Sequence, residues 1–550
     1  MTLRRISLFV VLFLLMGLDS FALPGASPGG QALNLSKFVD QLPIPPSIQL
    51  RGRRPFELTI TLGQFEAKLH RDLPPQPEWG YDGSSPGPTI QIERGRKLTV
   101  HWKNQLPEVH LFQAPKGADR ITPDVRAITH LHGAVVTEPD PMDRLHNNDG
   151  WPDAWNIPGQ EQIAEYPNDQ AARTLWYHDH AMGETGRNVA AGLLGLYEIH
   201  DRYERSLNLP SGRYDIPLAI QARGVNADGS LYYTADIANE FYGNALAVNG
   251  KLWPFLNVEP RKYRFRIVNV SNARSYALSL AEADDGATSS GNAGPAFYQI
   301  GTGSGFLQDT VILNDPSDPA SPKLVLAPAE RADVIIDFSG VAGRSFVLKN
   351  SSHDPGENEI SIPEVMLFKV GSTLLSPDTS ALPLHLRPIP RLRVADAAGA
   401  RQIIFGQMAM PDGTLMQTLN GRSWKDPIED RPVLGTTEVW ELANTLTDVH
   451  PFHIHGLQFQ VLDRTFFDVQ AFLATGKINY LAPPVPPLAN EMGWKDTVRV
   501  LPQMVTRIIL KFSPFPGYYV YHCHILEHED MDMMRPFEIV PPGTLELTPR

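Results

Sequence analysis

The chain has 550 residues and a formal net charge of −13; 42% of its residues are hydrophobic and 20% are charged. This composition is typical of a folded protein and excludes wholesale disorder, and the negative charge argues against nucleic acid or an anionic membrane surface as the main partner. A single cysteine accompanies 17 histidines. One cysteine excludes an intrachain disulfide framework and any CxxC zinc or redox site.

The N-terminus has the pattern of an export signal. Arg4 and Arg5 precede an apolar stretch of 13 residues, 6–18, which is followed by Ser20, Phe21 and Ala22. A basic flank, a short apolar core and small residues before the cleavage point predict a signal peptide over residues 1–22. The apolar stretch is shorter than the roughly 20 residues that a membrane span needs. We therefore expect export to the periplasm or the cell exterior, and no stable membrane insertion after cleavage. The adjacent Arg4 and Arg5 partly match the signal for the twin-arginine route, which is one candidate route of export.

Three related segments recur along the chain, over residues 83–104, 250–269 and, more loosely, 419–444. In each segment a turn leads into alternating apolar and polar residues, as in Leu98, Val100 and Trp102. A period of two predicts half-buried strands. The best short helical candidate is the stretch 469–477.

The three repeats predict an all-β protein made of three Greek-key β-sandwich domains. We expect these domains over residues 23–205, 206–385 and 386–550. Such a fold is equally compatible with an adhesive or structural protein, so function has to come from a site.

Four His-x-His pairs are present, more than the histidine content predicts by chance. Residues i and i+2 lie on one face of a strand, so each pair can converge on one metal ion. A single pair taken alone is weak evidence for a metal site, because two histidines on one strand face, one or both of them solvated, give the same pattern. The pairs are His130/His132, His178/His180, His453/His455 and His522/His524.

The lone cysteine, Cys523, lies between two histidines, with His528 and Met533 further along. Strand alternation directs Cys523 to one face and the flanking histidines to the other. Thiolate and imidazole with a more distant methionine are the ligands of a blue-copper centre. The segment 450–455 offers the second imidazole. A Cys-His nucleophile is the rival interpretation, but it needs one general base and no array of histidine pairs.

Four motifs in the chain resemble the copper-binding motifs of the multicopper oxidases: HLHG (130–133), WYHDH (176–180), HPFHIHG (450–456) and HCHILEHEDMDM (522–533). Stretches such as GWKDTV and HCHILEHEDMDMMRP most resemble the branch of bacterial spore-coat laccases and bilirubin oxidases. The resemblance covers nearly the whole mature chain. It implies that the three sandwiches are cupredoxin-like.

The resemblance also implies four copper ions per chain, with ligands assigned by motif position. A type 1 copper would be held by His450, Cys523 and His528, with Met533 as the axial ligand. His130 and His453 would hold a type 2 copper. The type 3 pair would be held by His132, His178, His180, His455, His522 and His524. Because the motifs lie in the first and third repeats, the three-copper site is expected between domains one and three, with the middle domain as a spacer.

Two carboxylates match positions that move protons in this branch. Glu529 resembles its proton-delivery glutamate, and Asp149 resembles its acidic residue near the type 2 side. The simpler interpretations are a local salt bridge for Glu529 and a turn-capping role for Asp149. The segment between His132 and Asp149 is several residues longer than the branch's pattern, and it carries Glu138, Asp140 and Asp143.

The activity implied is laccase-like: one-electron oxidation of phenols, aromatic amines or bilirubin-type pigments, coupled to four-electron reduction of O2 to water. An alternative is a metallo-oxidase of Cu(I), Mn(II) or Fe(II) with a role in metal tolerance. A third hypothesis is a non-enzymatic envelope protein that has lost its copper, and the intact ligand set argues against it. The expected partners are a small reducing substrate and O2, and the expected state is a monomer.

Overall fold

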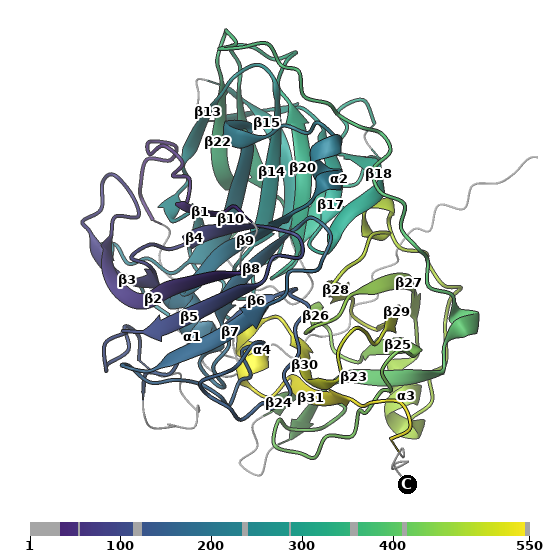
Figure 1. Cartoon of the computed structure of the whole chain (residues 1–550). Coiled ribbons are helices and arrows are strands. Elements are labelled where there is room, and N and C mark those ends of the chain that lie inside the picture. Colours follow the sequence, from purple (N-terminus) through teal and green to yellow (C-terminus); the bar gives the residue numbers. More distant parts are fainter. Residues whose placement is uncertain are drawn as a thin grey trace, which may run out of the picture.

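The structure is a computed structural model that describes residues 33–52, 55–113, 124–233, 240–284, 288–318, 320–352, 361–409 and 415–544. The predicted signal peptide lies outside the described residues. Strands dominate the described chain and form six sheets in three packed pairs (Figure 1). The prediction of an all-β protein with three β-sandwich domains is confirmed. Within the described ranges, none of the helices is both long and apolar enough to traverse a bilayer.

The N-terminal sandwich packs a five-stranded sheet on a four-stranded one. Ile60 and Val100 from one sheet and Ile90 and Tyr177 from the other are fully buried in its core. The sheets, in spatial order, are β1 (Ser47–Leu50), β4 (Gly87–Glu93), β9 (Leu194–His200), β8 (Arg173–Asp179) and β6 (Thr129–His132); and β3 (Gln76–Tyr81), β2 (Phe56–Ala67), β5 (Leu98–Asn104) and β7 (Glu161–Tyr166).

The middle sandwich packs a seven-stranded sheet on a six-stranded one, and Phe265, Val334, Leu348 and Phe368 lie fully buried or nearly so between them. The first sheet runs β12 (Lys251–Leu252), β11 (Ala245–Val248), β10 (Asp215–Arg223), β14 (Lys262–Asn269), β20 (Arg331–Asp337), β17 (Phe297–Thr302) and β18 (Gly305–Leu313). The second runs β13 (Phe255–Val258), β22 (Glu364–Val370), β21 (Ser345–Asn350), β15 (Tyr276–Asp284) and β16 (Thr288–Ala293), with β19 (Leu324–Leu326) paired to β15.

The C-terminal sandwich packs a five-stranded sheet on a four-stranded one around Trp440, Phe452, Ile508 and Tyr521. The first sheet runs β24 (Leu415–Leu419), β23 (Gly399–Ala409), β25 (Thr437–Asn444), β29 (Met504–Lys511) and β27 (Phe459–Phe466). The second runs β28 (Thr497–Val500), β26 (His450–Ile454), β30 (Gly517–Cys523) and β31 (Met534–Ile539). Within the described residues, the helices are short: α1 (Thr185–Ala191), α2 (Arg202–Ser206), α3 (Val469–Thr475) and α4 (Leu526–Asp530), with 3₁₀ turns at Gly212–Tyr214, Val394–Asp396 and Ala489–Glu491.

Helix α3 confirms the helical candidate at 469–477. It begins where the Asp468 carboxylate accepts the N–H of Ala471 at 2.9 Å, and it ends at Gly476, whose φ is 69°. An N-terminal Asp cap and a left-handed glycine are the usual boundaries of a helix.

Each sequence repeat begins with the same turn. Asp82, Asn249 and Asn420 have φ values of 49°, 50° and 57°, and each precedes a glycine with positive φ. Asp-Gly and Asn-Gly pairs are favoured where both turn residues need positive φ. A side-chain oxygen of each first residue accepts a strand N–H, from Thr61, Ala219 and Ile404 respectively, at 2.7–2.9 Å. The repeated sequence therefore builds a repeated local structure.

The asparagine that ends each repeat has a common role as well. Asn104, Asn269 and Asn444 are buried at the ends of β5, β14 and β25. The side-chain oxygen of each accepts the N–H of the residue two positions later, at 3.1, 3.0 and 2.9 Å respectively. This local bond lets the chain turn out of the strand without leaving a backbone donor unpaired.

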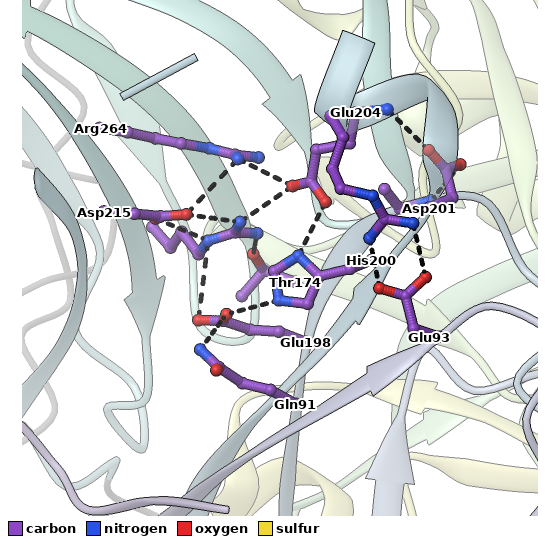
Figure 2. A network of polar contacts seen from close by, with 12 residues as sticks. Gln91, Glu93, Thr174, Glu198, His200, Asp201, Glu204, Asp215 and Arg264 are labelled. Carbon is purple, nitrogen blue, oxygen red and sulfur yellow. Dashed lines mark hydrogen bonds and ion pairs between the residues drawn. The ribbon is translucent and has the colours of Figure 1, made fainter. Parts of the chain in front are cut away.

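Strand β14 departs from the expected half-burial, because its polar residues Arg264 and Arg266 are as buried as its apolar ones. Figure 2 shows the network that encloses this face, contributed by the N-terminal and middle sandwiches. Arg264 donates to Glu204 at 2.8 Å, and Arg266 donates to Asp215 at 2.8 Å and to Glu204 at 3.0 Å. Burial disfavours a charged His200, but its two neighbouring carboxylates raise its pKa to about 9. A second sandwich covers the polar face, which no local pattern reveals.

Candidate metal centre

The four His-x-His pairs lie on strands and strand ends that meet where the N-terminal and C-terminal sandwiches join (Figure 1). In the pairing of β6 with β8, His130 lies opposite His178. In the pairing of β26 with β30, His453 lies opposite His522. All predicted ligands are at most 2% exposed: His130, His132, His178, His180, His450, His453, His455, His522, Cys523, His524, His528 and Met533.

Groups of three ligand atoms approach one another within 4.8 Å. Three such groups are His130/His132/His453, His132/His178/His524 and His180/His455/His522, and a separate group is His450/Cys523/His528. Each histidine group draws on both the N-terminal and the C-terminal sandwich. The described part of the middle sandwich supplies no residue to these groups.

Hydrogen bonds on the outer side of the rings orient the histidines. The Nδ1–H groups of His130, His453 and His178 donate to the carbonyls of Asp149, Asp496 and Asp179 respectively, at 2.5, 2.9 and 2.8 Å. The Nε2 atom of each of these three rings is buried without a hydrogen-bond partner. Outer hydrogen bonds that fix the tautomer are typical of metal-binding histidines. The unpartnered nitrogens are therefore free to bind a metal.

Two further nitrogens approach one another closely. His522 Nε2 lies 3.2 Å from His455 Nε2 and 3.4 Å from His180 Nε2. Burial and the neighbouring imidazoles lower the pKa of most rings in the cluster, that of His178 to about 4. Lowered pKa values favour the neutral state, which is the state that a metal requires. His522 differs, because against the effect of burial Glu529 raises its pKa.

The thiol group forms a second site, on the opposite face of β30. Cys523 Sγ lies 3.4 Å from His450 Nδ1 and 3.7 Å from His528 Nδ1. Burial opposes ionisation of the thiol, but the two imidazoles lower its pKa to about 7. A thiolate with two imidazoles is the donor set that suits a blue-copper centre.

Met533 returns to this site through a left-handed turn at Asp532, whose φ is 81°. Its carbonyl accepts the N–H of Cys523 at 3.0 Å, and its own N–H donates to the carbonyl of His528 at 2.9 Å. Met533 is fully buried in the same core cluster as Cys523. The methionine therefore lies beside the thiolate and imidazole group.

Comparison with known proteins gives the family of the chain. Residues 66–114 and 124–204, and separately 402–543, match the multicopper oxidase family. A laccase from Bacillus subtilis is 40% identical over 93% of this chain and 100% of its own length. The chain belongs to the multicopper oxidase family. A bilirubin oxidase from Albifimbria verrucaria is 34% identical over 91% of this chain and 81% of its own.

Solved structures support the same assignment. A multicopper oxidase from Aquifex aeolicus superposes with a TM-score of 0.74 at 27% identity, over 92% of this chain and all of that one. A laccase from Pediococcus acidilactici superposes with a TM-score of 0.71 at 30% identity, over 93% and 95% of the two chains. The protein is accordingly a copper-dependent oxidoreductase that uses O2, and its imidazole and thiolate donors fit copper.

Both predicted acidic residues of this multicopper oxidase contact the histidine cluster. Asp149 Oδ2 accepts the Nδ1–H of His455 at 2.9 Å, and burial raises the pKa of Asp149 to about 7. Glu529 Oε2 lies 2.9 Å from His522 Nδ1, and Oε1 lies 3.5 Å from His180 Nε2. Burial opposes ionisation of Glu529, but these imidazoles lower its pKa to about 2. The structure therefore brings both carboxylates to the cluster. The contacts of Glu529 are also those of a local salt bridge, and the proton role of either residue stays a prediction.

The long segment between His132 and Asp149 packs against β30, the strand that carries Cys523. Tyr519 donates to the carbonyl of Val136 at 3.0 Å, and the Tyr518 N–H donates to the carbonyl of Glu138 at 3.0 Å. The buried Glu138 carboxylate accepts the N–H groups of Asn148 and Asp149 at 2.7 and 3.2 Å. Within this segment Glu138 therefore holds the backbone of Asp149 in place.

Sequence reasoning missed two carboxylates on the outer side of the thiolate site. Glu240 Oε1 lies 3.0 Å from His528 Nε2, and Asp448 Oδ2 lies 3.4 Å from His450 Nε2. Both side chains are 20% exposed, whereas the two histidines are buried. Asp448 precedes His450 by two residues, so the motif itself could have indicated it. Glu240 comes from the middle of the chain and has no such signal.

The remaining described histidines take no part in these groups, as expected. Each contacts a side chain or a carbonyl group elsewhere: His70 with Ser36, His101 with Glu57, His110 with Asn188, His146 with Asp143, His200 with Glu204 and His385 with Asp309. His353 lies outside the described residues.

Proposed function

We propose that this multicopper oxidase is laccase-like and binds four copper ions. His450, Cys523, His528 and Met533 would hold the type 1 copper, and His130 and His453 the type 2 copper. The type 3 pair would be held by His132, His178, His180, His455, His522 and His524. Bound copper would supply a one-electron acceptor at the thiolate site and four-electron reduction of O2 to water at the cluster.

The observation that carries this proposal is the arrangement on β30. Cys523 belongs to the thiolate group, while its chain neighbours His522 and His524 belong to two different histidine groups. One tripeptide therefore joins the two sites through covalent bonds. Electrons taken from a reducing substrate at the thiolate site would pass along this tripeptide to the cluster, and Glu529 and Asp149 would supply protons there.

The proposed donors are phenols, aromatic amines or bilirubin-type pigments, in keeping with the laccase and bilirubin oxidase among the relatives. A second candidate, oxidation of Cu(I), Mn(II) or Fe(II), is favoured by one specific observation. The partly exposed carboxylates of Glu240 and Asp448 lie at the outer nitrogens of the two histidine ligands. Anionic oxygen atoms attract cations at that position and can ligate hard metal ions.

One experiment separates the two donor classes. O2 uptake by the copper-loaded protein is measured with phenols, bilirubin, Cu(I), Mn(II) and Fe(II), for the wild type, Glu240→Gln and Asp448→Asn. Asp309→Asn, an exposed acid of the middle sandwich, is the matched control. For a metallo-oxidase we expect KM to rise for the metal ions only. For a laccase-like enzyme we expect turnover of phenols or pigments. In that case the KM for the metal ions does not rise more in Glu240→Gln and Asp448→Asn than the KM for the phenols or pigments.

The copper assignment has its own test. Cys523→Ser should abolish the visible type 1 absorption and all substrate oxidation, while the far-ultraviolet circular dichroism stays that of a β protein. Oxidase activity that persists in Cys523→Ser would refute the assignment.

Export is tested separately, by N-terminal sequencing of the protein recovered outside the cytoplasm, and we expect the sequence to start near residue 23. The oligomeric state is tested by sedimentation, and we expect a monomer.

A further inference from the structure

Two adjacent ion pairs connect the middle sandwich to the C-terminal sandwich beside the histidine cluster. Arg331 binds Asp496 through two hydrogen bonds of 2.6 Å, one to each carboxylate oxygen. Next to this pair, Lys495 donates to Glu330 at 2.8 Å. All four side chains are at most 9% exposed. A bidentate arginine–carboxylate pair fixes both partners in plane as well as in position.

Asp496 also contacts two histidines of the cluster. Its carbonyl accepts the Nδ1–H of His453 at 2.9 Å, and its Oδ1 accepts the hydroxyl of Thr497 at 3.0 Å. Because the Thr497 hydroxyl donates to Asp496, it acts as an acceptor for His132 Nε2, 3.1 Å away. Asp496 Oδ1 itself lies 3.4 Å from the same nitrogen. The rings of His132 and His453 are stacked, with centroids 3.6 Å apart.

The side chain of Arg331 is closely surrounded. Its Nε–H donates to the carbonyl of Thr174 on β8, the strand that also carries His178. Two glycines allow this close approach. A Cβ atom at Gly303 would lie 2.2 Å from Arg331 Cζ, and one at Gly133 would lie 2.7 Å from Asp496 Oδ2. Arg331 therefore contacts all three sandwiches at a point where no larger side chain fits.

We propose that Arg331 is a positioning residue for the type 2 end of the copper cluster, acting through Asp496 on His132 and His453. This inference rests on the proposed copper assignment. Arg331 holds the Asp496 carboxylate in its plane and compensates its charge, so His132 Nε2 stays with Thr497 and its Nδ1 faces the other ligands. The middle sandwich is then part of the metal centre and not only a spacer.

The physical argument concerns what Asp496 does without its partner. A buried carboxylate that loses its counter-charge seeks the nearest N–H and O–H groups. Those groups are Thr497 and His132 Nε2. A shift of Asp496 toward them would draw the ring of His132, a type 3 ligand, out of its present orientation. It would also displace the Asp496 carbonyl that orients the type 2 ligand His453. Loss of a group that orients a metal ligand typically weakens metal binding about 10- to 100-fold.

The test compares Arg331→Met and Arg331→Lys with Lys495→Met in the copper-loaded full-length protein. Lys495→Met is the matched control, because it breaks the neighbouring ion pair across the same interface without removing a contact of Asp496. Copper per chain is measured by metal analysis after dialysis against a graded chelator series. The type 2 and type 1 signals are resolved by electron paramagnetic resonance, and the type 1 site is also followed by its visible absorption.

We expect Arg331→Met to lose type 2 copper at a chelator concentration about 10- to 100-fold lower than the wild type does, with the type 1 signal retained. Arg331→Lys, which keeps the charge but not the bidentate geometry, should be intermediate and show a shifted type 2 spectrum; it also serves if Arg331→Met does not fold. Lys495→Met should match the wild type. Wild-type type 2 retention and spectrum in the arginine variants would overturn the inference. A wild-type protein without type 1 and type 2 signals would instead refute the copper assignment on which it rests.

Discussion

Glu138 allows a quantitative prediction about the long segment before Asp149. Its side chain is 1% exposed, and burial raises its pKa from an ordinary value of 4.5 to about 8, against the effect of two N–H donors. Between pH 4.5 and 8 the folded chain retains a proton that the unfolded chain has released. Stability therefore falls as pH rises through this window, and the difference in pKa corresponds to about 5 kcal/mol in total.

Glu138→Gln removes this titration, while its amide oxygen can still accept the N–H groups of Asn148 and Asp149. The variant and the wild type should be about equally stable near pH 4.5. The free energy of unfolding of the variant should exceed that of the wild type by a growing amount, up to about 5 kcal/mol near pH 9. Urea unfolding at pH 5, 7 and 9 measures this difference, in which the contributions of all other groups cancel.

Asp140→Asn is the control for Glu138→Gln, because Asp140 lies on the same segment and is exposed. Because Asp140 is exposed, Asp140→Asn should not reproduce the gain in stability that Glu138→Gln shows at high pH. Parallel pH profiles for Glu138→Gln and the wild type would refute the reasoning. That result would mean that Glu138 is solvated or compensated in the folded protein.

Two further predictions follow from other contacts. Glu529→Gln should slow O2 reduction about 100-fold, with an unchanged rate of type 1 reduction in stopped-flow absorption, because only the cluster loses its proton carrier; equal slowing of both steps would contradict a proton role. Arg266→Met should lower the free energy of unfolding by about 3–5 kcal/mol, since it leaves Glu204 and Asp215 as buried anions that are short of a counter-charge. Arg205→Met, whose ion pair with Glu93 is largely exposed, should cost at most about 1 kcal/mol in the same thermal and urea measurements.

Local rules predicted the strands and turns well. The alternation over 98–102 predicted β5 together with its buried face. The Asp-Gly and Asn-Gly pairs of the repeats form turns that require positive φ. These features depend on residues one to four positions apart, so they can be read along the chain. The same rules predicted half-burial for β14, and they missed the burial of Arg264 and Arg266 because the covering sandwich is distant in sequence.

The metal-ligating candidates were predictable for the same reason. A His-x-His pair on a strand places two rings on one face, and four such pairs with one cysteine leave few other interpretations. The direction of each ring was not predictable, since it depends on carbonyl groups of other strands. The contact between Arg331 of the middle sandwich and the Asp496 carboxylate was not predictable either, because the two residues are distant in sequence.

The sequence alone therefore determined the β architecture, the repeated turns and the residue types that gather into a thiolate site and a histidine cluster. Beyond Asp149 and Glu529, only the tertiary structure showed which distant charged residues contact the two sites. Glu240 meets His528, Glu138 holds the backbone of Asp149, and Arg331 meets Asp496 across 165 positions of sequence. The physical reason is that strand geometry repeats every two residues, whereas a buried charge is compensated by whichever group the packing of another sandwich brings within hydrogen-bonding distance.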